Sequence, residues 1–362
     1  MKISSSKTIA KHGRPVDWRS LLAYVRALED FTRSAPARLP ARTFARINAA
    51  PPIQAPAVQE FEARDGCRLA YRAYAAAESR QVVVLIHGSA GYGDQMGTIA
   101  RRLAAANVAS AYTIDMRGHG LSDGRSGHAV RHPWQLIEDM GDFLGQVREM
   151  HPGARLCLAG HSAGGGLALG LSRSEAGGLI DSYLFLAPFL GLGCPANRPY
   201  FGGWVSLRAL KLRALTLANL FGVDRFNDAT VVDFDIREAT DARYTPNWSY
   251  NTMLAFGPGR WLPDAAPIAA DKPVLVLAGD EDDCFVPNLY ADAFATVAPH
   301  AAIRSAGPIG HWDLLVSDQA IAEVAGWLAD HALADLVDKA RVDASGRPTP
   351  NRAAPKRLKE AS

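Results

Sequence analysis

One stretch of the chain places a serine where it could act as a nucleophile. Residues 156–169 read as an apolar run, then Gly-His-Ser-Ala-Gly, then a segment rich in leucine and alanine. This order predicts a strand, a tight turn and a helix, which is the setting of a G-x-S-x-G nucleophile elbow. Such a turn strains the backbone of Ser162, and side chains in place of Gly160 or Gly164 would clash across it. The alternative is a glycine-rich turn that only packs a helix close to a sheet.

A serine hydroxyl needs a base that removes its proton, and the base needs a carboxylate that fixes its tautomer. In an enzyme with this elbow, the acid and then the histidine follow the serine, each after a strand. The apolar run 274–278 predicts a buried strand that opens into four carboxylates at 280–283, and a later glycine-rich turn ends in His311. We predict that His311 is the base and that Asp282 is the acid, with Asp283 as the competing choice.

Acyl transfer at a serine also needs two backbone N–H groups that stabilise the negative oxygen of the tetrahedral intermediate. Ala163 directly follows the candidate nucleophile and would supply one of them. The sequence His87-Gly88-Ser89 follows the apolar run Val-Val-Val-Leu-Ile, which predicts a strand over 82–86. We predict that the N–H of Ser89 is the second donor.

The elements that must position these residues alternate between strand and helix. A run of apolar residues without alternation is typical of a strand that is buried on both faces of a parallel sheet. Alternation of such strands with helices indicates a doubly wound α/β sheet with its site at the carboxyl ends of the strands. Strands are predicted over 57–63, 68–74, 82–86, 109–114, 156–160, 180–187, 273–278 and 301–305, and helices over 94–107, 132–150 and 318–331 and from about residue 287.

The alternation defines a domain over residues 57–338 and stops between about 188 and 271. That segment is too long for a plain loop, so we expect an inserted cap, with a helix near 205–221. Residues 1–56 form a basic extension in which Asp17–Phe31 has the apolar spacing of one amphipathic helix. Residues 339–362 form a basic tail that we expect to be disordered.

Three motifs in the sequence together resemble those of the α/β-hydrolase superfamily, and the resemblance covers roughly residues 57–330. The pair His87-Gly88, the turn Asp-Met-Arg-Gly-His-Gly-Leu-Ser at 115–122 and the elbow at 160–164 are similar to those of monoacylglycerol lipase and lysophospholipase-like serine hydrolases of the serine aminopeptidase type. The resemblance implies the α/β-hydrolase fold and a structural role for His119. The acid loop, 279–287, is one residue longer than the pattern of the family, and for this reason Asp282 and Asp283 compete.

The motifs predict a serine hydrolase, an esterase or lipase, that cleaves carboxylic esters through an acyl-enzyme. The cap is rich in leucine and aromatic residues, which favours a monoacyl lipid or a small acyl ester as substrate. A thioesterase, a peptidase or an acyltransferase could use the same triad, because a fold does not determine a substrate. A non-catalytic binding module of the same fold is the alternative outside enzymes. We expect no cofactor, and no metal, since the histidines lack the spacing of metal ligands.

Composition constrains the partners and the location. The 362 residues carry a formal net charge of +2, which argues against a nucleic acid partner. Residues 1–48 contain ten Lys and Arg against three Asp and Glu, so the N-terminal helix could contact a membrane surface instead of docking on the main domain. The four cysteines show no C-x-x-C spacing, and the N-terminus has no apolar signal region. These features predict a cytoplasmic protein with reduced thiols.

Overall fold

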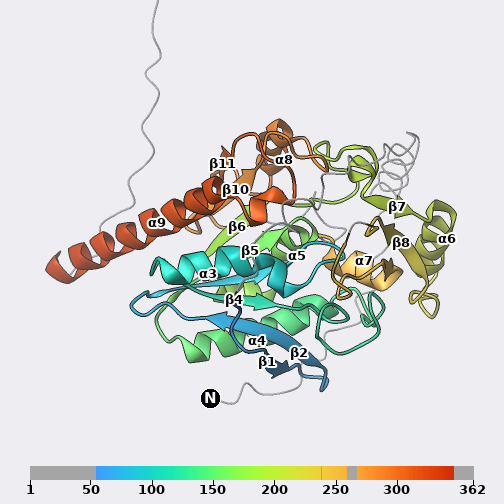
Figure 1. Ribbon diagram of the computed structural model, residues 1–362, viewed down its shortest axis with the longest axis horizontal. Coiled ribbons are helices and arrows are strands. Elements are labelled where there is room, and N and C mark those ends of the chain that lie inside the picture. The colour runs from blue at the N-terminus through green and yellow to red at the C-terminus, as the bar shows by residue number, and fades with distance from the viewer. Residues whose placement is uncertain (1–53, 238, 259–266, 346–362) are drawn as a thin grey trace, which may run out of the picture.

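Eight strands form one mixed sheet in the computed structural model, which describes residues 54–237, 239–258 and 267–345 (Figure 1). The strand order is β1-β2-β4-β3-β5-β6-β10-β11. The β1–β2 and β2–β4 pairs are antiparallel, and all other neighbours are parallel. The strands are β1 (Gln59–Glu62), β2 (Arg68–Tyr74), β3 (Gln81–Ile86), β4 (Ser110–Ile114), β5 (Arg155–His161), β6 (Ser182–Leu186), β10 (Val274–Ala278) and β11 (Ala302–Ser305).

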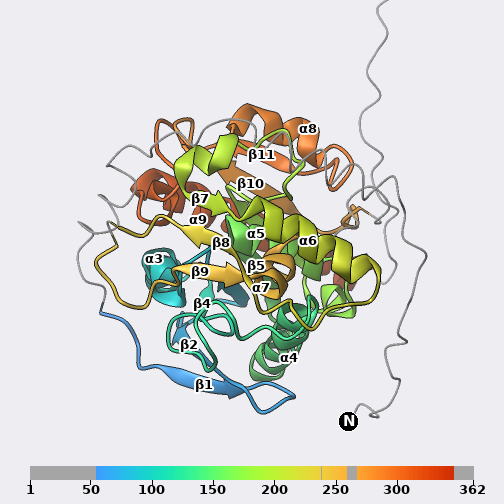
Figure 2. The same ribbon diagram turned by 90° about the vertical axis from the view of Figure 1, so that its right-hand side faces the viewer.

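Helices cover both faces of the sheet, which explains the apolar runs of its central strands. Helices α3 (Gly97–Ala105) and α9 (Asp318–Ser345) lie on one face, and α4 (Gln135–Met150) and α5 (Ala163–Leu171) lie on the other (Figure 2). Every residue of β3, β4, β6 and β10 is buried. The predicted doubly wound, mostly parallel sheet is therefore confirmed. Shorter helices are η1 (Gly93–Met96), η2 (Glu175–Leu179), η4 (Pro287–Leu289), α8 (Tyr290–Phe294) and η5 (Asp313–Leu315).

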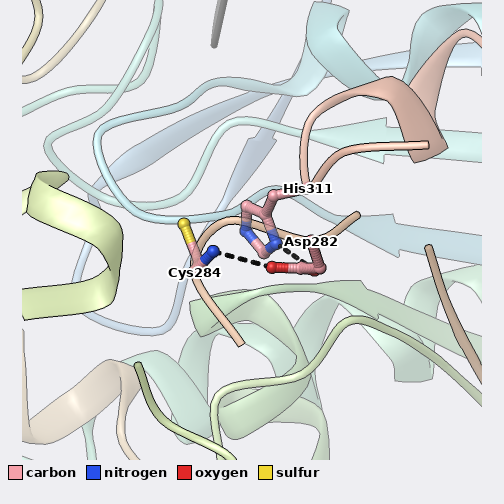
Figure 3. Close-up of side chains that lie close together, drawn as sticks. All are labelled: Asp282, Cys284 and His311. Atoms are coloured by element: carbon pink, nitrogen blue, oxygen red, sulfur yellow. Dashed lines mark hydrogen bonds and ion pairs between the residues drawn. The ribbon is translucent and has the colours of Figure 1, made fainter. Parts of the chain in front are cut away.

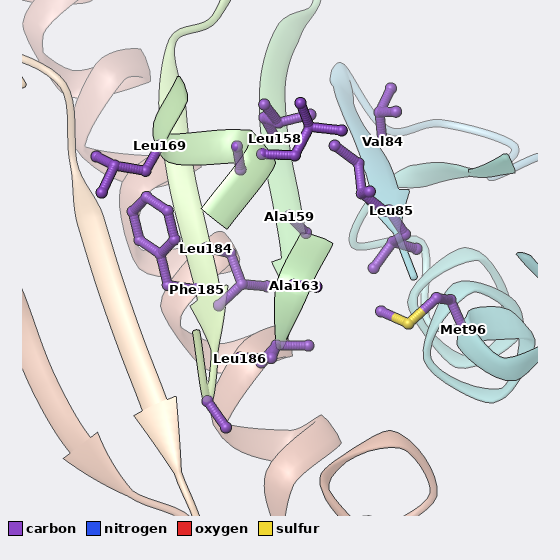
Figure 4. Close-up of a cluster of buried hydrophobic side chains, with 14 of the residues drawn as sticks. Val84, Leu85, Met96, Leu158, Ala159, Ala163, Leu169, Leu184, Phe185 and Leu186 are labelled. Carbon is purple, nitrogen blue, oxygen red and sulfur yellow. The ribbon is translucent and has the colours of Figure 1, made fainter. Parts of the chain in front are cut away.

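The hydrophobic core is centred on β3, β5 and β6, the three strands nearest the candidate nucleophile. Val84, Leu158 and Phe185 from these strands are fully buried, and Leu169 of α5 lies in the same cluster (Figure 4). Complete burial of one such side chain contributes roughly 1.5–3 kcal/mol to the free energy of unfolding. The elbow of Ser162 and the loop of Ser89 therefore leave from buried strands of the core.

The cap is built differently from its prediction. It contains a three-stranded antiparallel sheet in the order β7-β8-β9, which the sequence analysis missed. The helix predicted over 205–221 begins only at Ala209, because Val205 pairs with Phe234 of β8 and so lies in a strand. The elements of the cap are η3 (Pro199–Gly203), β7 (Val205–Leu207), α6 (Ala209–Leu220), β8 (Thr230–Phe234), β9 (Asn247–Ser249) and α7 (Tyr250–Phe256).

The last helix also differs from its prediction. Helix α9 runs from Asp318 to Ser345, so residues 339–345 are helical and do not belong to a disordered tail. Residues 332–345 are rich in good helix formers and contain no proline or glycine, whereas Gly346 follows directly. The rest of the tail and the predicted N-terminal helix lie outside the described residues. Among the residues that are described, no helix is both long enough and apolar enough to cross a bilayer.

Candidate active site

Ser162 occupies the junction between β5 and α5, as the elbow motif predicts. Strand β5 ends at His161 and α5 begins at Ala163. The backbone of Ser162 has φ 52° and ψ −119°, a conformation that residues with a Cβ rarely adopt. Backbone hydrogen bonds hold this strained residue: its N–H donates to the carbonyl of Leu186 at 2.9 Å, and its carbonyl accepts from the N–H groups of Phe189 at 2.8 Å, Gly165 at 2.9 Å and Gly166 at 3.3 Å. Strain that neighbours hold in place in this way is typical of functional positions.

The two glycines of the motif are required by close backbone contact. A Cβ at Gly164 would lie 2.5 Å from the carbonyl oxygens of Ile86 and His87, and a Cβ at Gly160 would overlap the carbonyl of Gly164. Neither clash can be relieved by rotating a side chain, because both involve the backbone. The steric reason that the sequence analysis gave for these glycines is confirmed.

This contact predicts a specific loss in Gly164→Ala. We expect the free energy of unfolding to fall by about 1–3 kcal/mol, because the added methyl group overpacks the turn. Urea unfolding followed by circular dichroism measures the change. Gly145→Ala in α4 is the matched control, since a Cβ there has no neighbour within 4 Å. Gly145→Ala should be neutral or stabilise the protein by up to about 1 kcal/mol. Equal stabilities of the two variants would contradict the clash.

Asp282 and His311 form a buried hydrogen-bonded pair. The Oδ2 atom of Asp282 accepts from Nδ1 of His311 at 2.9 Å, and both residues are 1 % exposed (Figure 3). The Oδ1 atom of Asp282 accepts from the N–H groups of Cys284 and Phe285, both at 2.8 Å. The carboxylate is thus held on both oxygens. Of the two carboxylates that competed in the sequence, the structure brings Asp282 to the imidazole.

The electrostatics of the pair suit a base. Burial alone would lower the pKa of His311, but the charge of Asp282 and the hydrogen bond to it outweigh that effect. The pKa of His311 therefore lies above its ordinary value. A raised pKa makes the imidazole a better proton acceptor, and the bond at Nδ1 leaves Nε2 as the nitrogen that can accept.

The elbow and the loop of His311 are in direct contact through His161, the neighbour of Ser162. The rings of His161 and His311 lie 4.6 Å apart between centroids. Nε2 of His161 donates to the backbone carbonyl of His311 at 3.2 Å. Burial lowers the pKa of His161 well below its ordinary value, so this ring is neutral. No hydrogen bond between the Ser162 hydroxyl and His311 is found in the described part of the chain, and such bonds often tighten only when substrate is bound.

The two predicted oxyanion donors lie on the loops that meet at Ser162. A Cβ on Gly88 would be 3.1 Å from the Cβ of Ser162, so the loop after β3 passes directly beside the nucleophile. Ala163 is the first residue of α5, where N–H groups lack partners within the helix. Within the residues described, neither the N–H of Ser89 nor that of Ala163 donates a hydrogen bond. Both donors are therefore available to a substrate oxygen.

The other histidines near the site hold the scaffold. His87 is fully buried and accepts from the N–H of Met116 at 3.1 Å, which joins the ends of β3 and β4. His119 accepts from Nε1 of Trp248 at 2.8 Å and so links the main sheet to the cap. Burial lowers the pKa of His87 to about 3 and that of His119 to about 4. Both rings are neutral hydrogen-bonding groups at neutral pH.

Cys284 stands close to the acid and the base. One potential ligand atom each from Asp282, Cys284 and His311 lies within 4.8 Å of the others, close enough for a metal ion to be considered (Figure 3). Burial raises the pKa of the Cys284 thiol well above its ordinary value, which keeps it protonated and a poor ligand. Asp282 and His311 already satisfy one another. We therefore interpret the group as an acid–base pair beside a buried thiol.

The mostly parallel sheet, the strained serine after β5 and the buried carboxylate–imidazole pair define the class of α/β hydrolases. Residues 77–305 match the family described as serine aminopeptidase, S33, and because this match spans more than half of the chain, the protein belongs to that family. The resemblance noted in the sequence is confirmed.

Known relatives agree with this assignment. The chain is 28% identical to a monoacylglycerol lipase of Mycolicibacterium smegmatis over 229 residues, which are 61% of this chain and 78% of the relative. A soluble variant of monoglyceride lipase from Saccharomyces cerevisiae is 20% identical with a TM-score of 0.61, over 82% of this chain and 99% of that one. The monoacylglycerol lipase of Paleococcus ferrophilus is 19% identical with a TM-score of 0.52, over 73% and 99% of the two chains. At these identities the two solved structures support the fold.

Proposed function

We propose that this protein is a serine hydrolase that cleaves the ester of a monoacyl lipid through an acyl-enzyme. Ser162 is the nucleophile, His311 the base, Asp282 the acid that orients it, and the N–H groups of Ser89 and Ala163 form the oxyanion hole. The observation that carries the proposal is the buried hydrogen bond of 2.9 Å between Asp282 and His311. The loop of His311 also contacts the elbow of Ser162 through the ring of His161.

In the proposed first step, the Ser162 hydroxyl attacks the ester carbonyl carbon while Nε2 of His311 takes its proton. The carbonyl oxygen becomes negatively charged and accepts from the N–H groups of Ser89 and Ala163. The tetrahedral intermediate then collapses, the bond to the leaving alcohol breaks, and His311 donates the proton to that alcohol. Water repeats the sequence on the acyl-enzyme, which releases the fatty acid and restores the hydroxyl of Ser162.

Two features support a lipid substrate. One matched relative, from a bacterium, is a monoacylglycerol lipase. In addition, helix α6 of the cap exposes large apolar side chains at positions that share one face of the helix. Leu210 and Leu217 are 82% and 54% exposed, Phe221, which caps the end of the helix, is 75% exposed, and Phe226 beyond it is 53% exposed. Such a face suits an enzyme that meets its substrate in a lipid aggregate.

A substrate panel tests the proposal. We expect the kcat/KM of the purified enzyme for a monoacylglycerol to exceed that for an aminoacyl p-nitroanilide by at least about 100-fold. Cleavage of the aminoacyl amide would also require a site that binds a charged α-amino group. A series of p-nitrophenyl esters from two to twelve carbons then measures the preferred acyl chain. Faster turnover of the aminoacyl amide would instead assign a peptidase to this site.

The exposed face of α6 predicts a difference between dispersed and dissolved substrates. The double variant Leu217→Ser with Phe221→Ser should raise KM at least about tenfold for a monoacylglycerol held in phosphatidylcholine vesicles, because each lost side chain removes roughly 1.5–3 kcal/mol of apolar burial. Hydrolysis of dissolved p-nitrophenyl butyrate is the internal control and should change by less than about twofold, since both side chains are exposed on the cap. Equal effects on both substrates would contradict a lipid-facing role.

A further inference from the structure

A tryptophan of the cap contacts the loop that carries a proposed oxyanion donor. Trp204 lies just before β7, and its Nε1–H donates to Oγ of Ser89 at 3.0 Å. Both side chains are buried, with exposed fractions of 2% and 7%. The two residues are separated by 115 positions in the chain, so only the folded cap brings them together.

The loop of Ser89 has few side chains of its own to fix its orientation, and within it the Gly88 carbonyl accepts from the N–H of Gly91 at 3.2 Å and from Nδ1 of His87 at 2.8 Å. It contains Gly88 and Gly91, which carry no side chain, and Ala90, whose φ of 58° is strained for a residue with a Cβ. A second contact also comes from the cap, since the N–H of Thr245 donates to the carbonyl of Ala90 at 2.9 Å. Two separate segments of the cap therefore hold this loop, one at the side chain of Ser89 and one at the carbonyl of Ala90.

The same indole reaches the loop of the base. Trp204 packs edge to face on Trp312, with 5.2 Å between ring centroids, and Trp312 directly follows His311. Trp312 also contacts the ring of His161, at 5.4 Å, beside the nucleophile. One residue of the cap thus contacts the oxyanion loop through a hydrogen bond and the base loop through a ring contact.

We propose that Trp204 is a positioning residue for the oxyanion hole, an inference that rests on the proposed function. By holding the Ser89 side chain, it fixes the peptide N–H of Ser89 toward the place where the carbonyl oxygen of the substrate gains charge. An oxyanion donor is effective only when it is preorganised in that direction. The hydrogen bond uses the hydroxyl of Ser89 and so leaves its peptide N–H free to donate to the substrate oxygen.

Three variants separate positioning from packing. Trp204→Phe keeps an aromatic ring but removes the N–H, and Ser89→Ala removes the acceptor but keeps the backbone donor. Each should lower kcat for p-nitrophenyl butyrate about tenfold with KM within about twofold, the effect expected from one lost buried hydrogen bond. The double variant should fall no further than about threefold below either single variant, because both remove the same bond.

Trp248→Phe is the matched control. It removes an equivalent buried indole hydrogen bond from the cap, that of 2.8 Å to His119, which is outside both loops of the site. Its melting temperature should fall by an amount similar to that of Trp204→Phe, while its kcat stays within about twofold of wild type. Butylboronic acid forms a tetrahedral adduct with a serine. Its Kd for Trp204→Phe should rise by the same factor by which kcat falls, and its Kd for Trp248→Phe should equal that of the wild type.

A kcat of Trp204→Phe equal to that of Trp248→Phe, or fully additive losses in the double variant, would overturn the positioning role of Trp204. Neither result would contradict the proposed function. If Trp204→Phe does not fold, a kcat of Ser89→Ala equal to wild type overturns it as well. A wild-type chain that turns over no ester would overturn the proposed function together with this inference.

Discussion

Ser162→Ala should reduce ester turnover by at least about 10⁴-fold, because it removes the hydroxyl that forms the acyl-enzyme in the proposed mechanism. Residual hydrolysis would come from the oxyanion donors alone, which retain part of the stabilisation. The measurement is kcat for p-nitrophenyl butyrate under saturating substrate. The melting temperature should change little, since the Ser162 hydroxyl donates no hydrogen bond within the described residues and its backbone bonds remain in the variant.

Ser172→Ala provides the matched control for this loss. It removes a serine hydroxyl from the other end of α5, where it donates to the carbonyl of Leu169 at 2.8 Å. We expect its kcat to stay within about threefold of wild type, because surface substitutions distant from a site have small effects. Wild-type turnover in Ser162→Ala would show that Ser162 is not the nucleophile.

Asp282→Asn is the second large effect, with an expected fall in kcat of about 10⁴-fold, because the amide favours the wrong tautomer of His311. It should also move the pH profile. His311 must be neutral to act as a base, so activity is lost as pH falls through its pKa, which lies above the ordinary value of 6.5 in the wild type. Removing the negative charge of Asp282 lowers that pKa. The acid limb of kcat/KM should therefore shift to lower pH in the variant.

Asp283→Asn is the control that the sequence itself suggests. Asp283 contributes least among the groups that raise the pKa of His311, and the hydrogen bond at Nδ1 belongs to Asp282. We expect a fall in kcat of less than about tenfold and a smaller shift of the acid limb in the same direction. A larger loss in Asp283→Asn than in Asp282→Asn would assign the role of the acid to Asp283.

The features that were predictable from sequence are those that local patterns determine. Five consecutive residues, 160–164, define the elbow at Ser162. The buried strands β3, β5 and β10 are apolar runs that require cover on both faces. The order of serine, acid and histidine follows from the way the loops leave the carboxyl ends of successive strands. For this reason the sheet could be predicted from the sequence, together with the loops that carry the candidate serine, acid and histidine.

The features that were missed depend on contacts between distant residues. The strand β7 forms because Val205 pairs with Phe234. No local sequence pattern predicts a pairing between residues so far apart in the chain. The contact of Trp204 with Ser89 is of the same kind. The preference for Asp282 over Asp283 was predicted from spacing, but the contact itself depends on how the lengthened loop folds around the N–H groups of Cys284 and Phe285.

Covalent labelling tests whether Ser162 is an activated nucleophile. A fluorophosphonate probe reacts with an activated serine by forming a bond from its oxygen to phosphorus as fluoride leaves. Incubation of the full chain with this probe, followed by intact mass measurement and peptide mapping, should show one adduct on Ser162 and none in Ser162→Ala. An absence of labelling in the wild type, or equal labelling of Ser162→Ala, would show that Ser162 is not the nucleophile.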